Sequence, residues 1–220
     1  MVKERLQAVP AVIQIPVGAG GPESNKPFIG LIDIVKMKAL IWQDEELGAK
    51  WDEVDIPADQ IDEANQYRAE LLEVIAGSDD EFMEKYLANE EITQADIKKA
   101  LRAGTLAFDF VPILCGSAFK NKGVQPMLDA AIDFLPSPLD IQAATGTNAK
   151  GDEELTRPAD ENGPFAALAF KIVADPFGKL TYFRVYSGSV SKGDEVYNSV
   201  KEKRERIGRL LLMHANNRED

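Results

Sequence analysis

Cysteine and histidine are almost absent from this chain of 220 residues, which contains one of each, Cys115 and His214. A single cysteine excludes an intramolecular disulfide and any cysteine-rich zinc site. Its neighbours Pro112, Ile113 and Leu114 are apolar, so a buried and unreactive thiol is expected. Because His214 lies far along the chain and has no second histidine beside it, a Cys/His nucleophile pair is not expected either.

Long apolar runs are also missing. No window approaches 18 uninterrupted apolar residues, the shortest length typical of a transmembrane helix. The first ten residues, MVKERLQAVP, are charged where a secretory signal peptide needs an apolar core. With 45% hydrophobic and 28% charged residues, the composition is that of a globular protein with one or two cores. The sequence therefore predicts a globular protein of the cytoplasm.

Positive charge is scarce, and it is unevenly distributed. The net charge of −12 argues against a protein whose main role is to bind nucleic acid. Residues 44–96 contain 18 Asp or Glu against 3 Lys or Arg, whereas residues 201–213 contain 5 Lys or Arg against 2 Glu. The acidic part repels phosphate groups, and the basic part can bind them.

The first half of the chain predicts a small α+β unit over about residues 9–106. Before it, residues 2–8 read as the last turns of a helix, because the run is short and has no N-cap signal. Runs rich in Ile and Val, separated by loops that contain Gly, Pro and Asn, predict strands of a mainly antiparallel sheet. These runs are residues 11–18, 27–35 and 36–43.

Three amphipathic helices are expected after these strands. The first begins near Asp59, and its apolar residues recur every three or four positions: Ile61, Ala64, Leu71, Leu72 and Ile75. The stem of Arg68 can lie along the same face. Ser78, with Glu81 three residues later, predicts a capping box for the second helix, and Thr93 is the expected N-cap of the third. Together the helices would cover one face of the sheet.

Residues 109–138 predict a strand, a turn and a helix of a larger α/β sheet. The run FVPILCGS is continuously apolar, as in strands buried on both faces. The following helix has an expected packing stripe of Val124, Leu128, Ala131, Ile132 and Leu135. Residues 139–163 read as a polar linker, and period-two runs over 164–220 predict part of an antiparallel β-barrel.

Several long segments resemble bacterial translation elongation factor G in order and spacing. They are PFIGLIDIVKMKALIW, DEFMEKYLANEEIT, ILCGSAFKNKGVQPMLDAAIDFLPSPLDI, PFAALAFKIVADPFGKLTYFRVYSG and KEKRERIGRLLLMHANNRE. The resemblance implies an α+β insert subdomain at about 9–106, placed on a remnant of a P-loop GTPase α/β domain that spans 1–138. The last core strand and helix would be 107–138. A partial antiparallel β-barrel, the first half of domain II, would follow at 164–220.

In this family the intact protein uses GTP and Mg²⁺ to drive movement of tRNA and mRNA on the ribosome. The turn Gly116, Ser117 and Ala118 would contact the guanine base, because short side chains let backbone N–H groups approach the guanine oxygen. No GxxxxGK[ST] phosphate loop and no Asn-Lys-x-Asp motif occurs in the sequence. This chain alone is therefore expected to have no catalytic residue, no metal ligand and no cofactor.

The acidic helix at 57–76 resembles the element that docks the C-terminal domain of the ribosomal stalk protein in this family. The carboxylates expected to do so are Asp62, Glu63, Glu70 and Glu73. A row of carboxylates on one helix face steers a basic partner and mainly raises the association rate. A helix face that is merely solvated remains the alternative.

The basic run of the barrel would contact rRNA of the small subunit, as the second domain does in this family. Its residues are Lys201, Lys203, Arg204, Arg206 and Arg209. In a strand, Lys201 and Lys203 share one face with Glu205, so only part of the run can meet one ligand. A solvated barrel face remains possible. The turn DPFGKL at 175–180 is one residue shorter than the form common in bacterial members, which puts its contacts in doubt.

Two alternatives stay open. The chain also has the features of the equivalent segment of release factor 3 or of a ribosomal protection protein, and a free-standing guanine-nucleotide-binding enzyme is the rival from another class. A nucleotide titration tests the enzyme alternative, because a chain without a phosphate loop should show no measurable affinity for a guanine nucleotide. We also expect self-association, since the strand at 109–115 would present unpaired edges and an uncovered apolar face.

Overall fold

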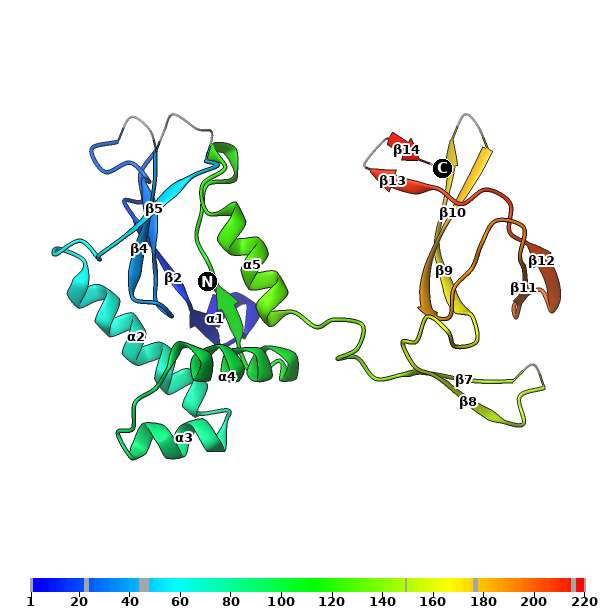
Figure 1. Ribbon diagram of the computed structural model, residues 1–220, viewed down its shortest axis with the longest axis horizontal. Coiled ribbons are helices and arrows are strands. Elements are labelled where there is room, and N and C mark those ends of the chain that lie inside the picture. Colours follow the sequence, from blue (N-terminus) through cyan, green and yellow to red (C-terminus); the bar gives the residue numbers. More distant parts are fainter. Residues whose placement is uncertain are drawn as a thin grey trace. The chain divides into compact units, whose positions relative to one another are not determined.

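The computed structural model divides the chain into two compact units, residues 1–135 and 136–220, which are described separately (Figure 1). The residues that the structure describes are 2–21, 24–43, 48–148, 150–175, 178–214 and 217–219. No helix among them is long and apolar enough to cross a membrane.

The first unit is organised around a four-stranded antiparallel sheet in the order β2-β3-β4-β5. Its strands are β2 (Gln14–Val17), β3 (Gly30–Asp33), β4 (Lys38–Trp42) and β5 (Trp51–Val54). The run 11–18, expected as one strand, is divided at Ile13. Before it, β1 (Pro10–Val12) pairs in parallel with β6 (Val111–Ile113). The N–H of Ile13 donates to the carbonyl of Ile113 at 3.1 Å, and its carbonyl accepts from Ile34 at 3.0 Å. Ile13 therefore joins the two sheets.

Strand β5 was not predicted, because its sequence WDEV is rich in acidic residues, which are depleted in strands. It forms at the edge of the sheet, where charged side chains face solvent. Ion pairs cross from the preceding hairpin to this edge: Lys36 to Glu53 at 3.3 Å and Lys38 to Asp55 at 2.7 Å.

The three expected helices are α2 (Ile61–Ala76), α3 (Asp80–Leu87) and α4 (Gln94–Ala107), and a short α1 (Val2–Leu6) precedes the sheet. The three helices share one buried core with the strands, but they do not all lie over one face of this sheet: α2 packs beside β1, and α3 and α4 lie beyond the end of the sheet (Figure 1). The shared core includes Ile15, Ile32, Ile34, Leu71, Ile75, Ile97 and Leu101, all of them buried. The three-and-four spacing of the apolar residues thus places the helix faces correctly.

Of the two predicted N-caps, one is confirmed and the other is wrong. Thr93 caps α4, and its reciprocal partner Asp96 completes a capping box. The predicted cap at Ser78 is wrong, because the carboxylate of Asp79 accepts from the N–H of Phe82 at 2.9 Å and begins α3. The hydroxyl of Ser78 instead donates to the carbonyl of Ile75 at 3.1 Å, at the end of α2. Of two adjacent capping residues, the later one begins the helix.

Arg68 ties α2 to the turn between β3 and β4. Its Nη1 donates to the carbonyls of Ile34 at 2.6 Å and Val35 at 2.8 Å. Burial raises the pKa of Asp33, whose carboxylate accepts from the N–H groups of Val35 and Lys36 in the same turn. Burial also lowers the pKa of the Arg68 guanidinium, and the charge of Asp33 opposes that shift. Besides the expected packing of its stem, Arg68 thus anchors the turn through hydrogen bonds of its guanidinium.

Replacing Arg68 tests this link. Arg68→Met keeps most of the apolar stem but leaves two carbonyls without their donor, so we expect a loss of about 1–3 kcal/mol in the free energy of unfolding, measured by urea denaturation. Arg5→Met, on the exposed side of α1, should change the stability by no more than about 0.5 kcal/mol. Equal stability of the two variants would contradict the anchoring role.

The other face of the sheet packs against the segment that follows β6. Leu31, Leu40 and Trp42 form a second buried cluster, with Trp51 and Cys115 against it. Cys115 is half-buried rather than buried as expected, and burial raises the pKa of its thiol to about 11. The 3-10 helix η2 (Ala118–Lys120) and helix α5 (Val124–Phe134) come next.

The predicted packing stripe of α5 is wrong in its main members. Leu128 and Ile132 are 53% and 77% exposed, and Leu135, just after the helix, is exposed as well, whereas Phe134 is the buried residue. Strand β6 is not buried on both faces either, because Val111 is exposed and the next two residues are half-buried. Among the described residues β6 pairs only with β1.

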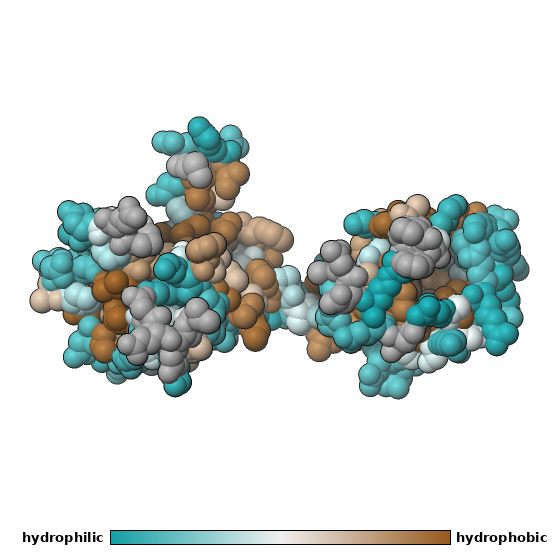
Figure 2. Space-filling view, turned by 90° about the horizontal axis from the view of Figure 1, so that it is seen from above, coloured by the Kyte–Doolittle hydropathy of each residue, from teal (hydrophilic) through white to brown (hydrophobic). Residues whose placement is uncertain are grey.

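Apolar surface is therefore left uncovered in the first unit. Figure 2 shows hydrophobic residues at the surface of this unit, interspersed with hydrophilic ones. Leu128 and Ile132 of α5 contribute to this surface, and Phe108 and Phe119 are still more exposed. Self-association through such a surface stays a prediction.

The second unit consists of hairpins. Residues 139–163, expected as a linker, contain an antiparallel pair, β7 (Ala144–Thr147) and β8 (Glu154–Arg157). The polar composition of this stretch reflects solvent exposure rather than an absence of strands. A long hairpin of β9 (Ala166–Asp175) and β10 (Gly178–Ser187) follows. Two shorter hairpins complete the unit: β11 (Glu195–Asn198) with β12 (Lys203–Arg206), and β13 (Leu212–His214) with β14 (Asn217–Glu219). All of these pairs are antiparallel, as predicted.

Candidate functional site

The turn Gly116-Ser117-Ala118 is held in shape by a backbone bridge. The N–H of Ser117 donates to the carbonyl of Lys122 at 2.8 Å, and the N–H of Lys122 donates back at 3.0 Å. A Cβ on Gly116 would lie 2.8 Å from that same carbonyl oxygen, so a side chain does not fit there without displacement. The close approach explains the glycine at this position.

The exposed side of the turn presents two backbone donors. Ser117 uses its N–H internally, but the N–H groups of Gly116 and Ala118 have no acceptor among the described residues. Both residues are exposed, so these donors are accessible to a carbonyl oxygen of a base. The described residues contain no group of three or more His, Cys, Asp or Glu side chains that could hold a metal ion. Contact of this turn with a guanine base stays a prediction.

The four carboxylates of the candidate docking site lie together on the exposed face of α2. Asp62, Glu63, Glu70 and Glu73 are all exposed, opposite the buried Leu71 and Ile75. We call these four residues the acidic face. Helical geometry puts them within about one third of the circumference, with Gln66 between them. The amide of Gln66 donates to Glu70 at 3.0 Å.

Unlike several other carboxylates of the first unit, the acidic face has no lysine or arginine partner among the described residues. Several of those are neutralised by lysines, such as Glu53 by Lys36, and Glu81 by Lys99 at 2.8 Å. Within the described ranges, no Lys or Arg lies within ion-pair distance of the acidic face. Its negative charge is therefore available to a basic partner.

The basic run is partly neutralised within its own hairpin. Lys201 lies in the turn before β12 rather than in the strand, and it forms an ion pair with Glu205 at 2.9 Å. This contact and one from Asn198 lower the pKa of the Glu205 carboxyl. Arg204 reaches Glu195 on the neighbouring strand at 3.5 Å.

The remaining members of the basic run differ from one another. Arg206 donates from Nε to the carbonyl of Gly193 at 3.0 Å, and Lys203 is exposed on β12. Arg209 follows β12 in the chain. The run therefore carries a weaker positive field than its sequence predicts. Of the short turn at 175–180, residues 176 and 177 lie outside the described residues.

Comparisons with known proteins agree with this architecture. The family model of elongation factor Tu domain 2 matches residues 178–220. A crystal structure of a protein from Thermus thermophilus is similar over 99% of this chain, with a TM-score of 0.73 and 26% sequence identity. The similar region covers 28% of that protein, so this chain spans about a quarter of its length. Together the two similarities support a segment related to the translational GTPases, with mixed helix and sheet and a partial barrel.

Proposed function

We propose that this chain is a segment of a ribosomal translocase of the elongation factor G type, and that its insert docks the ribosomal stalk protein. The intact protein would bind GTP with Mg²⁺ in the cytoplasm and hydrolyse it to promote movement of tRNA and mRNA. This segment would supply the turn at Gly116-Ser117-Ala118 to the guanine base. The hydrolytic machinery would come from elsewhere in the intact protein.

The observation that carries the docking proposal is the acidic face. Four exposed carboxylates without a cationic partner among the described residues lie on a helix whose opposite side is fixed in the core. A rigid row of like charges accelerates encounter with a basic surface and fixes its orientation. The basic run would add phosphate contacts to rRNA, which position a protein without reading sequence.

Co-sedimentation with ribosomes tests this function. The chain should pellet with intact ribosomes at low salt, and it should pellet much less with ribosomes stripped of the stalk protein. Any binding that remains on stripped ribosomes should fall further in the variant Lys203→Gln, whose side chain is exposed on β12. Equal pelleting with intact and stripped ribosomes would contradict stalk docking.

A further inference from the structure

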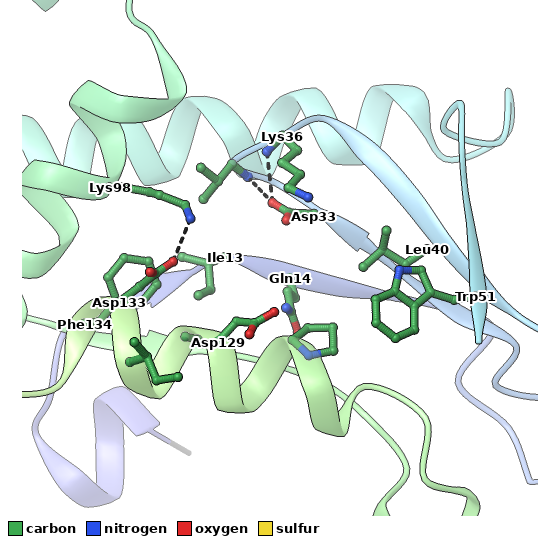
Figure 3. Close-up of a pocket in the computed structure, with 14 residues that line it drawn as sticks. Ile13, Gln14, Asp33, Lys36, Leu40, Trp51, Lys98, Asp129, Asp133 and Phe134 are labelled. Carbon is green, nitrogen blue, oxygen red and sulfur yellow. Dashed lines mark hydrogen bonds and ion pairs between the residues drawn. The ribbon is translucent and has the colours of Figure 1, made fainter. Parts of the chain in front are cut away.

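A cavity of about 290 Å³ opens between the four-stranded sheet and helix α5 (Figure 3). Its walls come from β2, β3, β4 and β5 on one side and from α4 and α5 on the other. This volume is at the lower end of the range for small-molecule pockets. None of its residues belongs to the three candidate surfaces described above.

Part of the cavity wall is apolar. Leu40 and Trp51 line it from the sheet, and Pro126 and Phe134 line it from α5. Trp51 also stacks at a tilt against Trp42, with 5.6 Å between the ring centroids, which fixes its orientation. An aromatic ring at the wall of a cavity attracts a cation as well as an apolar group.

Carboxylates outnumber available cations in the cavity. Asp33, Asp129 and Asp133 line it together with Lys36 and Lys98. Lys98 is bonded to Asp133 at 2.6 Å, and Lys36 is bonded at 3.3 Å to Glu53, which is not part of the lining. No lysine or arginine side chain is therefore paired with Asp33 or Asp129 among the described residues, although Oδ1 of Asp33 accepts from the backbone N–H groups of Val35 and Lys36. Figure 3 shows Asp33 on the sheet side and Asp129 on the α5 side.

A buried amide adds a donor to the same cavity. Gln14 is only 7% exposed, and its Oε1 accepts from the N–H of Cys115 at 3.4 Å. This contact places the amide nitrogen Nε2 on the other side, where it has no hydrogen-bond partner among the described residues. Because Gln14 lines the cavity, a ligand atom inside it can accept a hydrogen bond from this amide.

We infer that this cavity is a binding site for a small organic cation. Its ammonium or guanidinium group lies between Asp33 and Asp129, an adjacent oxygen accepts from the amide of Gln14, and an apolar or aromatic body packs on Trp51 and Leu40. The described residues contain no group of three or more His, Cys, Asp or Glu side chains that could hold a metal ion, here or elsewhere. The ligand contacts both the sheet and α5, so it links the expected insert to the expected core helix.

The probe for this site is phenylalaninol, which carries an ammonium group, a hydroxyl oxygen and a phenyl ring. In backbone NMR of the full chain, it should shift residues 13, 14, 33–36 and 126–134 and saturate in about the millimolar range. Phenylpropanol, the same molecule without its amine, should bind at least about tenfold more weakly. Equal binding of the two compounds would overturn the inference, as would shifts centred on the acidic face.

Asp129→Asn supplies the matched test on the protein. Asp129 is exposed and its carboxylate has no hydrogen-bond partner among the described residues, so the variant should fold normally. It should weaken phenylalaninol by about tenfold and leave phenylpropanol unchanged. The control Asp62→Asn removes a carboxylate of α2 that does not line the cavity and should change neither. Unaltered affinity for phenylalaninol in Asp129→Asn would show that the cavity does not select a cation.

Discussion

Neutralising the acidic face should weaken binding to the C-terminal domain of the ribosomal stalk protein by about 10- to 100-fold at low salt. The variant replaces its four members: Asp62→Asn, Glu63→Gln, Glu70→Gln and Glu73→Gln. The carboxylates are exposed and unpaired with cations in the described part of the chain, so their loss removes attraction without leaving a buried charge. Surface plasmon resonance should show the change mainly in the association rate, and the affinity of the unaltered chain should fall as salt rises.

A matched control separates this effect from a change in net charge. Four exposed acids of the second unit can be neutralised instead: Glu153→Gln, Glu154→Gln, Glu161→Gln and Glu202→Gln. The control has the same net charge as the test variant, and it should retain nearly the whole affinity. A loss of the same size in both variants would mean that only the overall negative charge of the chain matters.

Removing Leu71 from the core should cost about 2–5 kcal/mol of the free energy of unfolding of the first unit. Leu71 is 1% exposed and lies on the side of α2 opposite the acidic face. Leu71→Ala leaves a cavity where α2, α4 and the sheet meet, in a position that neighbouring side chains cannot fill without moving. Denaturation followed by the fluorescence of Trp42 and Trp51 measures the change in this unit.

Leu87→Ala makes the same chemical change at the end of α3, where the side chain is mostly exposed. It should alter stability by no more than about 0.5 kcal/mol. If Leu71→Ala were as mild as Leu87→Ala, the packing of α2 on the sheet would be wrong. The acidic face would then lack the rigid support on which its role depends.

The helices of the first unit were predictable because their apolar residues repeat with the helical period. Leu71 and Ile75 are buried as expected, and Thr93 is the N-cap of α4. The exact start of α3 was not predictable, since Ser78 and Asp79 are both good N-caps and only the geometry of the preceding helix end decides between them. The divided strand at Ile13 also escaped prediction, because an apolar run does not show where its hydrogen-bonding partner changes.

The candidate surfaces were predictable to different degrees. The exposure of Glu70 and Glu73 follows from their helical spacing, so the acidic face could be located from sequence. The partial neutralisation of Lys201 and Arg204 could not, because their partners are set by the pairing of β11 with β12 and by the turn between them. The cavity beside α5 carries no motif, since its polar residues come from positions as distant as Gln14 and Asp129.

Stalk docking by the acidic face is the central claim, and NMR tests it most directly. The isotopically labelled chain is titrated with the isolated C-terminal domain of the ribosomal stalk protein, and the backbone amide shifts are followed. The account predicts shifts centred on residues 57–76 that weaken as salt rises. A folded chain that shows no shifts at high concentrations of the partner, or shifts confined to the second unit, would contradict it.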